Sequence, residues 1–309
     1  MKKTITYTLY GLLGLAILIA AAGLFSRDDI SIPDGLKGKY VDIGGEKIRV
    51  HQQGAGLDVL LIHGLPGCIE DWDPVMDRLA KKYRVTVYDR PGHGFSGAKK
   101  AGYSLASNAD TAIELMRVLG LKNVTVAGHS YGGGITLAMA VRKPAAVKGY
   151  VSVAGVSYPV GHIDPAFYPV LIPLLGRGFA VIASNTMGTA MVKEGMKNAF
   201  SPNDNYLTDE ILKLRMRVFL QPKVIVSVAH EEITINRELP ALIAAYPDIR
   251  APFHILHGSG DLLLPYNDSR QLAKVVAGSR LTVLDGVGHQ VQFVRPETVI
   301  AAVDAIARK

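Results

Sequence analysis

The pentapeptide Gly128-His129-Ser130-Tyr131-Gly132 constrains the fold of this chain more than any other feature. An apolar, β-branched run at 124–127 precedes it and a helix-forming run at 135–142 follows. The segment therefore predicts a strand, a sharp turn and a helix, with one serine at the apex of the turn. Glycine at both ends removes the Cβ atoms that would collide where strand and helix nearly touch. A serine in such a turn is a candidate nucleophile at the carboxyl edge of a sheet.

The pentapeptide alone does not show that this serine is reactive; the other residues of a catalytic site have to be found. The chain has 32 glycines in 309 residues, so chance alone would place one such pentapeptide in about one chain in six. The strand before it and the helix after it lower that chance, but they supply no base, no acid and no oxyanion hole.

Short apolar runs alternate with helical segments on both sides of the turn. Tyr40–Ile43 and Lys47–Val50 flank Gly44-Gly45, a pair typical of a two-residue hairpin. Val59–Ile62 is apolar at consecutive positions, as a central parallel strand buried on both faces requires. Further strands are expected at 84–88, 147–154, 252–256 and 280–284, and helices at 74–81, 105–119 and 296–308. This alternation predicts an α/β fold with a doubly wound, mostly parallel sheet.

The alternation stops after Ser157. From Tyr158 to about Pro247 the chain has several prolines and helical stretches near 206–220 and 222–237, and strands resume only afterwards. An insertion between two strands of such a sheet lies over their carboxyl ends, where α/β proteins bind ligands. We therefore expect a helical cap. The predicted division is a membrane anchor or signal segment (1–26), the first part of the core (27–157), the cap (158–247) and the second part of the core (248–309).

The N-terminal segment is long enough to cross a membrane. Lys2 and Lys3 precede an uncharged stretch, Ile5–Phe25, which as a helix would reach roughly 32 Å. The lysines before it and Asp28-Asp29 after it predict a single-pass anchor with the catalytic part outside the cytoplasm, in the periplasm of a bacterium. The alternative is a cleaved signal peptide and a secreted protein. The apolar run is longer than a usual signal core, which favours the anchor.

Charge and cysteine content limit the partners and cofactors. The net charge is +7, but no dense run of basic residues accompanies it, so a membrane surface is favoured over nucleic acid, and a basic surface with neither partner is favoured over both. Cys68 is the single cysteine, so no intramolecular disulfide and no cysteine-based zinc spacing is available. His254 and His257 point to opposite faces of one strand and make a poor metal pair. We expect no metal, no cofactor and no nucleic acid; the sequence does not indicate the oligomeric state.

A nucleophilic serine needs a base, an acid that orients the base, and an oxyanion hole. Asp261 follows the strand at 252–256 and His289 follows the last strand, so both reach the sheet edge that presents Ser130. The glycine-containing turn Gly64–Gly67 follows Val59–Ile62 and can point its amides into the same place. Asp285 lies in the loop of His289 and is expected to brace that loop.

From about Tyr40 to its end, the chain resembles proteins of the α/β-hydrolase fold. The resemblance rests on five motifs in family order: His63-Gly64, Asp89–Ser96, Gly128–Gly133, Gly258–Asp261 and Gly288-His289. It implies that Ser130 is the nucleophile, His289 the general base and Asp261 the orienting acid. It also implies that the backbone amides of Leu65 and Tyr131 form the oxyanion hole, and that no cofactor is needed.

Together these features predict a serine hydrolase that cleaves carboxylic esters through an acyl-enzyme. A serine nucleophile argues against the halide- and epoxide-cleaving branches of the fold, whereas carbon–carbon bond hydrolases, amidases and perhydrolases remain alternatives. The anchor and the apolar segment Phe167–Leu175 resemble those of monoacylglycerol lipases and lipid esterases and indicate medium-chain or lipid-like esters. A non-catalytic ligand-binding member is disfavoured because all three triad residues are present.

Overall fold

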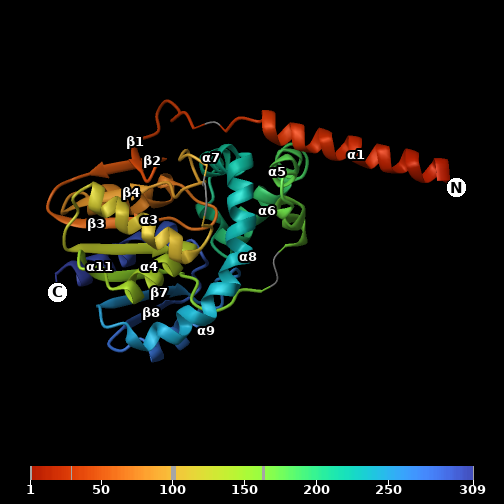
Figure 1. Cartoon of the computed structure of the whole chain (residues 1–309). Helices are drawn as coiled ribbons and strands as arrows, with labels where there is room; N and C mark the ends of the chain where they lie inside the picture. Colours follow the sequence, from red (N-terminus) through yellow and green to blue (C-terminus); the bar gives the residue numbers. More distant parts are fainter. Residues whose placement is uncertain (1, 29, 99–101, 162–163, 309) are drawn as a thin grey trace.

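One eight-stranded sheet forms the centre of the molecule in a computed structural model that describes residues 2–28, 30–98, 102–161 and 164–308. The strand order is β1-β2-β4-β3-β5-β6-β7-β8 (Figure 1). The first two pairs, β1–β2 and β2–β4, are antiparallel and the others are parallel, which confirms the predicted mostly parallel sheet. The strands are β1 Lys39–Ile43, β2 Glu46–Gln53, β3 Leu57–Ile62, β4 Tyr83–Tyr88, β5 Val124–His129, β6 Val147–Val153, β7 Phe253–Gly258 and β8 Arg280–Leu284.

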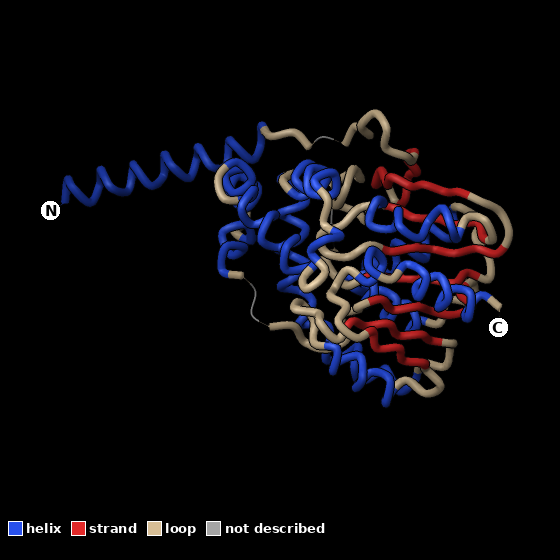
Figure 2. The backbone as a smooth tube through the Cα atoms, turned by 180° about the vertical axis from the view of Figure 1, so that it is seen from behind, coloured by secondary structure: helices blue, strands red, loops and turns tan. Residues whose placement is uncertain are grey.

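Helices cover both faces of the sheet, as Figure 2 shows from behind. Alternate residues of β3 explain this, because successive side chains of a strand point to opposite faces. Leu60 and Ile62 belong to one buried cluster, and Val59 and Leu61 belong to the other. The first cluster includes residues of α3 (Leu105–Val118), α4 (Tyr131–Arg142) and α9 (Tyr266–Val275); the second includes residues of α2 (Asp73–Leu79), the short α10 (Val291–Val294) and α11 (Pro296–Ala307). The sheet is doubly wound.

A helical segment is inserted between β6 and β7, which are neighbours in the sheet. Its elements are the 3-10 helix η2 (Pro165–Leu171), α5 (Gly176–Asn185), α6 (Gly188–Phe200), α7 (Asp209–Phe219) and α8 (Pro222–Ala245). The helical insert predicted from the loss of strand alternation is therefore present. Helix α8 continues beyond the expected end near Arg237, because Leu239 and its neighbours still pack against the buried cluster of α3 and α4. The boundaries at 157 and 247 stay a proposed division.

Helix α1 (Lys2–Phe25) projects from the body on the side of the insert (Figure 1). Within the described residues it is the one helix long and apolar enough to cross a membrane, and only 6% of its most apolar window is buried. Both an anchor and a signal sequence fit these properties. Its last turns contact α5, a contact that the sequence pattern did not indicate. Met1 and Asp29 of the predicted segment and its flank lie outside the described residues.

Candidate active site

Ser130 occupies the sharp turn between β5 and α4 that the sequence predicts. Its φ of 54° and ψ of −118° lie outside the regions that residues with a side chain ordinarily adopt. A Cβ at Gly128 would overlap the carbonyl oxygen of Gly132, and a Cβ at Gly132 would overlap that of Ile62. The two glycines are therefore required by close approach of strand, turn and neighbouring strand. The strained turn places Ser130 at the carboxyl edge of the sheet.

Asp261 and His289 meet at the same edge. Asp261 lies in the loop after β7, and His289 lies in the loop after β8. The Nδ1 atom of His289 is 2.7 Å from Oδ2 of Asp261. The other carboxylate oxygen, Oδ1, accepts hydrogen bonds from the backbone amides of Leu263 and Leu264 at 2.8 and 3.0 Å. Both oxygens of Asp261 are thus held, and the carboxylate fixes the imidazole through its Nδ1 side.

Burial alone would raise the pKa of Asp261, but the neighbouring imidazoles outweigh burial. The charge of His289 and the hydrogen bonds from His257 and His289 hold the pKa of Asp261 well below its usual range. The group is therefore an ionised acceptor throughout the physiological pH range. An ionised acid beside a histidine stabilises the imidazolium that forms when that histidine takes a proton.

A cavity of about 260 Å³ connects the site with the insert. Ser130, His289 and Leu65 contribute to its wall from the core. Most of the insert's contribution is apolar, and it includes Phe167, Val170, Met191, Val192, Met196 and Val228. Asp261 is not part of the wall, so it stands behind His289. The predicted nucleophile and base therefore share one cavity, while the predicted acid is shielded from it.

Two backbone amides lie near Ser130: that of Tyr131, the next residue in the chain, and that of Leu65 in the cavity wall. Tyr131 is the first residue of α4, so its amide has no acceptor within the helix. The amide of Leu65 likewise has no hydrogen-bond acceptor within the described parts of the chain. A Cβ added to Gly64, the residue before Leu65, would lie 2.9 Å from the Cβ of Ser130. The loop that contains Gly64 and Leu65 therefore lies directly against the serine. These are the two amides expected to form an oxyanion hole.

A second histidine contacts Asp261, and the sequence analysis did not assign it a role. The Nε2 atom of His257 is 3.0 Å from Oδ2 of Asp261, and its Nδ1 is 2.7 Å from Oγ of Ser269. His257 is the second-last residue of β7, four residues before Asp261. That spacing across a strand end could have indicated a contact, whereas His254 points away and bonds Thr282, as expected from opposite faces. His257 and His289 thus share the Oδ2 atom of Asp261.

His129 packs beside His289 without contacting the carboxylate. Its Nε2 lies 3.1 Å from the backbone oxygen of His289, and the two rings are 4.8 Å apart. Burial, with the charge of His289, lowers the pKa of His129 to about 3. The ring is therefore neutral and contacts the backbone of His289. Asp285 accepts a hydrogen bond from Ser259 at 3.0 Å and so braces its loop.

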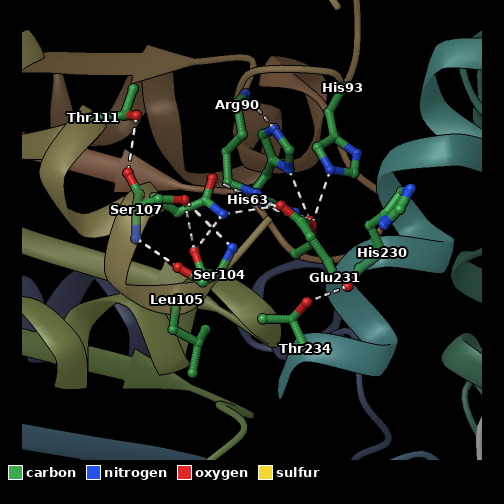
Figure 3. A network of polar contacts seen from close by, with 12 residues as sticks. His63, Arg90, His93, Ser104, Leu105, Ser107, Thr111, His230, Glu231 and Thr234 are labelled. Atoms are coloured by element: carbon green, nitrogen blue, oxygen red, sulfur yellow. Dashed lines mark hydrogen bonds and ion pairs between the residues drawn. The ribbon is translucent and has the colours of Figure 1, made fainter. Parts of the chain in front are cut away.

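A buried network, part of which Figure 3 shows, joins the insert to the Gly64–Gly67 loop, which contains the predicted oxyanion donor Leu65. Glu231 of α8 accepts hydrogen bonds from Arg90 at 2.7 and 3.0 Å, from Asn108 at 2.9 Å and from His93 at 3.0 Å. Arg90 also donates to the carbonyl oxygen of Gly64 at 2.8 Å, and its guanidinium lies 4.6 Å from the ring centroid of Tyr131. One carboxylate of the insert therefore supports residues next to both free amides.

Charged residues of the cavity wall differ in whether they are paired. Arg215 of α7 forms an ion pair with Asp71 and also donates to the sulfur of Cys68 at 2.9 Å. Glu232 of α8 has no hydrogen-bond partner within the described residues. Burial, helped by the charge of Asp164, raises the pKa of Glu232 to about 7. The arginine is thus neutralised in place, whereas Glu232 faces the cavity without a partner among the described residues. No cluster of metal-binding side chains occurs among the residues that the structure describes.

Comparisons with known proteins identify the fold family. The profile of the alpha/beta hydrolase fold matches residues 59–296. A 2-hydroxymuconate semialdehyde hydrolase from Pseudomonas sp. strain CF600 is 29% identical over 271 residues, which cover 83% of this chain and 88% of that protein.

Solved structures show the same fold at lower identity. An esterase from Exiguobacterium antarcticum superimposes with a TM-score of 0.72 at 23% identity, covering 88% of this chain and 100% of the esterase. The epoxide hydrolase CorEH superimposes with a TM-score of 0.74 at 20% identity, covering 87% of this chain and 98% of that chain. Proteins with different reactions share this fold, so the site has to indicate the chemistry.

Proposed function

The chain belongs to the α/β-hydrolase fold family, and on that premise we propose that it is a serine hydrolase that cleaves carboxylic esters. The observation that carries the proposal is the 2.7 Å contact of Asp261 with His289, whose imidazole borders the same cavity as the strained Ser130. In this proposal Ser130 is the nucleophile, His289 the general base and Asp261 the acid that orients it.

The reaction would proceed in two halves. Nε2 of His289 takes the proton of the Ser130 hydroxyl while Oγ attacks the ester carbonyl carbon, and the amides of Leu65 and Tyr131 donate to the oxyanion. The tetrahedral intermediate collapses, and His289 gives its proton to the leaving alcohol. Water then attacks the acyl-enzyme with His289 again as base, which releases the carboxylic acid and restores Ser130.

An apolar acyl group fits the cavity better than a charged one. The insert contributes mainly aliphatic and methionine side chains to the wall, and such residues adapt to flexible chains. We therefore assign medium-chain or lipid-like acyl esters, including monoacylglycerols, as substrates, with the insert acting as a cap over Ser130. Helix α1 would anchor the protein in a membrane, with the catalytic part outside the cytoplasm; a signal peptide is the alternative.

Carbon–carbon bond hydrolysis is the second candidate, because the same triad supports it and the Pseudomonas relative is named for hydrolysis of 2-hydroxymuconate semialdehyde. That name denotes a carboxylic acid, which a cationic side chain would recognise. Arg215 borders the cavity, but its guanidinium is already paired with Asp71. This pairing favours neutral esters over acidic substrates.

Ser130→Ala tests the proposed chemistry. Removing the nucleophile should lower kcat on p-nitrophenyl esters at least about 10⁴-fold and abolish labelling by a fluorophosphonate probe, while the protein stays folded. Ser184→Ala, a substitution in α5 outside the cavity wall, is the matched control and should leave both unchanged. A Ser130→Ala variant that retains activity would refute Ser130 as the nucleophile. A folded wild type that the probe never labels would refute the proposal and favour a ligand-binding protein.

An acyl-length series tests the substrate class. The value of kcat/KM should rise from acetyl to octanoyl esters as the chain fills the apolar cavity. Acidic substrates of the carbon–carbon reaction, such as 2-hydroxymuconate semialdehyde, should show no turnover. Highest kcat/KM on acetyl esters would overturn the assignment of acyl length but not the triad, and turnover of the acidic compounds would favour the carbon–carbon reaction.

A further inference from the structure

The last turns of α1 are fastened to α5 of the insert. The amide nitrogen of Gly178 lies 2.8 Å from the position that a Cβ on Gly23 would take, and a Cβ on Gly178 would overlap the carbonyl oxygen of Ile19. Close contact between the helix backbones depends on these two glycines. Figure 1 shows α5 directly beneath the end of α1.

Arg177 of α5 adds a polar clamp to this contact. Its Nε donates to the carbonyl oxygen of Gly23 at 3.1 Å and to Oγ of Ser26 at 3.0 Å. Its Nη2 pairs with Asp28 at 3.0 Å. The clamp engages the last turns of the apolar stretch and the residues just after it, and so holds the end of α1 against α5.

The part of α1 that precedes the close approaches of Ile19 and Gly23 to α5 is too short to cross a bilayer. From Ile5 to Leu18 the helix rises about 21 Å, whereas the hydrocarbon core of a bilayer is about 30 Å thick. The missing 9 Å, about six residues, bring the hydrocarbon boundary to Leu24 and Phe25. These two side chains are 81% and 85% exposed, as lipid-facing residues would be. A tilted helix would need still more residues in the core.

The insert presents apolar side chains beside this contact. We call Tyr168, Ile172, Leu174, Ile182 and Met187 the insert face; each is between 42% and 93% exposed. Leu174, the most exposed at 93%, lies just before α5 and has a φ of 66°, a left-handed conformation that leucine rarely adopts. The chain therefore holds a leucine away from its own core at a cost in backbone strain, which marks an interaction surface.

We propose that the insert face is embedded in the lipid leaflet that α1 enters, so that bilayer lipid is the partner of this surface. Because Ile19–Gly23 must lie in hydrocarbon and α5 is fastened to them, α5 and the residues beside it enter the same layer. The insert face adjoins the cavity that contains Ser130. Met187 belongs to both the insert face and the cavity wall, and Phe167 and Ala183, next in sequence to Tyr168 and Ile182, belong to the wall. An ester dissolved in the leaflet thus reaches Ser130 without crossing water. That last consequence rests on the proposed hydrolase function; the embedding rests only on α1 as an anchor.

Depth-dependent fluorescence quenching tests the embedding in the full chain, reconstituted in phosphatidylcholine–phosphatidylglycerol vesicles. An NBD label is attached to single introduced cysteines at Leu174→Cys, at Leu13→Cys in the middle of α1, and at Ala277→Cys. Ala277 is exposed and precedes β8, at the sheet edge opposite the site, and is the matched control. Cys68 is buried with its pKa raised by burial, so it does not take the label in the folded protein.

The expected result is that lipids carrying a nitroxide on the acyl chain quench the label at position 174 at least twofold more than at 277, and quench position 13 strongly. Strong quenching at 13 with equal, weak quenching at 174 and 277 would overturn the embedding while leaving the anchor intact. Weak quenching at 13 would overturn the anchor and the embedding together. Neither failure touches the hydrolase proposal, because fluorophosphonate labelling of Ser130 reads that independently.

Discussion

Replacement of the buried Glu231 by glutamine tests whether the insert supports the Gly64–Gly67 loop and its proposed oxyanion donor, Leu65. Glu231 is fully buried, and its two oxygens accept from Arg90, Asn108 and His93. Glutamine keeps the shape but removes the charge and turns one acceptor into a donor that faces other donors. Arg90, itself fully buried, then lacks a counter-charge. Removing one partner of a buried ion pair costs about 3–5 kcal/mol of unfolding free energy.

For a chain of 309 residues, this loss corresponds to a fall in Tm of about 5–8 °C. Catalysis should fall as well, because Arg90 donates to the carbonyl oxygen of Gly64, next to the amide of Leu65. Losing the alignment of one oxyanion donor costs about 10²-fold or more in kcat. KM should change little, since the cavity wall is untouched.

The assay is thermal unfolding and ester hydrolysis of the full chain in detergent micelles. Glu194→Gln, the same substitution at an exposed position of α6, is the matched control and should change neither quantity. In a double-mutant cycle, Glu231→Gln combined with Arg90→Gln should lose less stability than the two single variants summed, because the pair is already broken. Additive losses, or a Glu231→Gln variant as stable as Glu194→Gln, would refute the reasoning.

The acid side of the stability curve gives an independent check. Burial alone would raise the pKa of Glu231, but the charges of Arg90 and His93 outweigh it and hold the pKa well below its usual range. A carboxyl with a depressed folded-state pKa binds fewer protons when folded, so its contribution is present at neutral pH and is lost as the pH falls. Between about pH 5 and pH 2, wild type should therefore lose more stability than Glu231→Gln.

Three further substitutions test other parts of the site. Glu232→Gln should flatten the pH dependence of stability. With a folded-state pKa of about 7, the wild-type carboxyl binds more protons when folded, so wild type should lose up to about 3 kcal/mol of unfolding free energy between roughly pH 4.5 and pH 7. Urea midpoints that vary with pH in the same way in both proteins would contradict this. His257→Phe removes a hydrogen-bond donor to Asp261 and should lower kcat about 10-fold, because the carboxylate that orients His289 is then held less firmly; a change in Tm with no change in kcat would show that His257 only packs. Gly132→Ala should destabilise the protein by about 3 kcal/mol or more, because the added Cβ would meet the backbone of β3 and of His63. Gly195→Ala in α6 has open space around it and should stabilise the protein by up to about 1 kcal/mol. Equal Tm values for the two variants would contradict the close approach of Gly132 to β3.

Local pattern was sufficient for the core of the fold. The hairpin at Gly44-Gly45, the apolar run of β3 and the turn at Ser130 each follow from a period or a turn signal within ten residues or so. Helices α5 and α6 were not predicted from local pattern, because both are rich in small residues and their apolar positions are divided among the core, the cavity and the insert face. Their form depends on what they pack against, which a local window does not contain.

For the candidate site, chain order was sufficient for the residues that follow strands. Parallel strands bring their carboxyl ends to one edge, so Ser130, Asp261 and His289 could be expected together before any distance was known. Glu231 and Arg90 could not, because a charged residue on a helix has the same appearance in sequence whether it is solvated or buried. Only the packing of α8 on the core shows that this carboxylate has lost water and gained three donors.

The sequence by itself determined the sheet, the strained turn and the order of the reactive residues, because each depends on steric limits and periodicities within short segments. How the insert meets the rest of the molecule depended on tertiary packing. Glu231 is linked through Arg90 to the Gly64–Gly67 loop, His257 contacts Asp261, and α5 is fastened to α1 through Gly23, Gly178 and Arg177. These contacts join residues far apart along the chain, and their energies come from desolvation and close packing, which exist only once the parts are assembled.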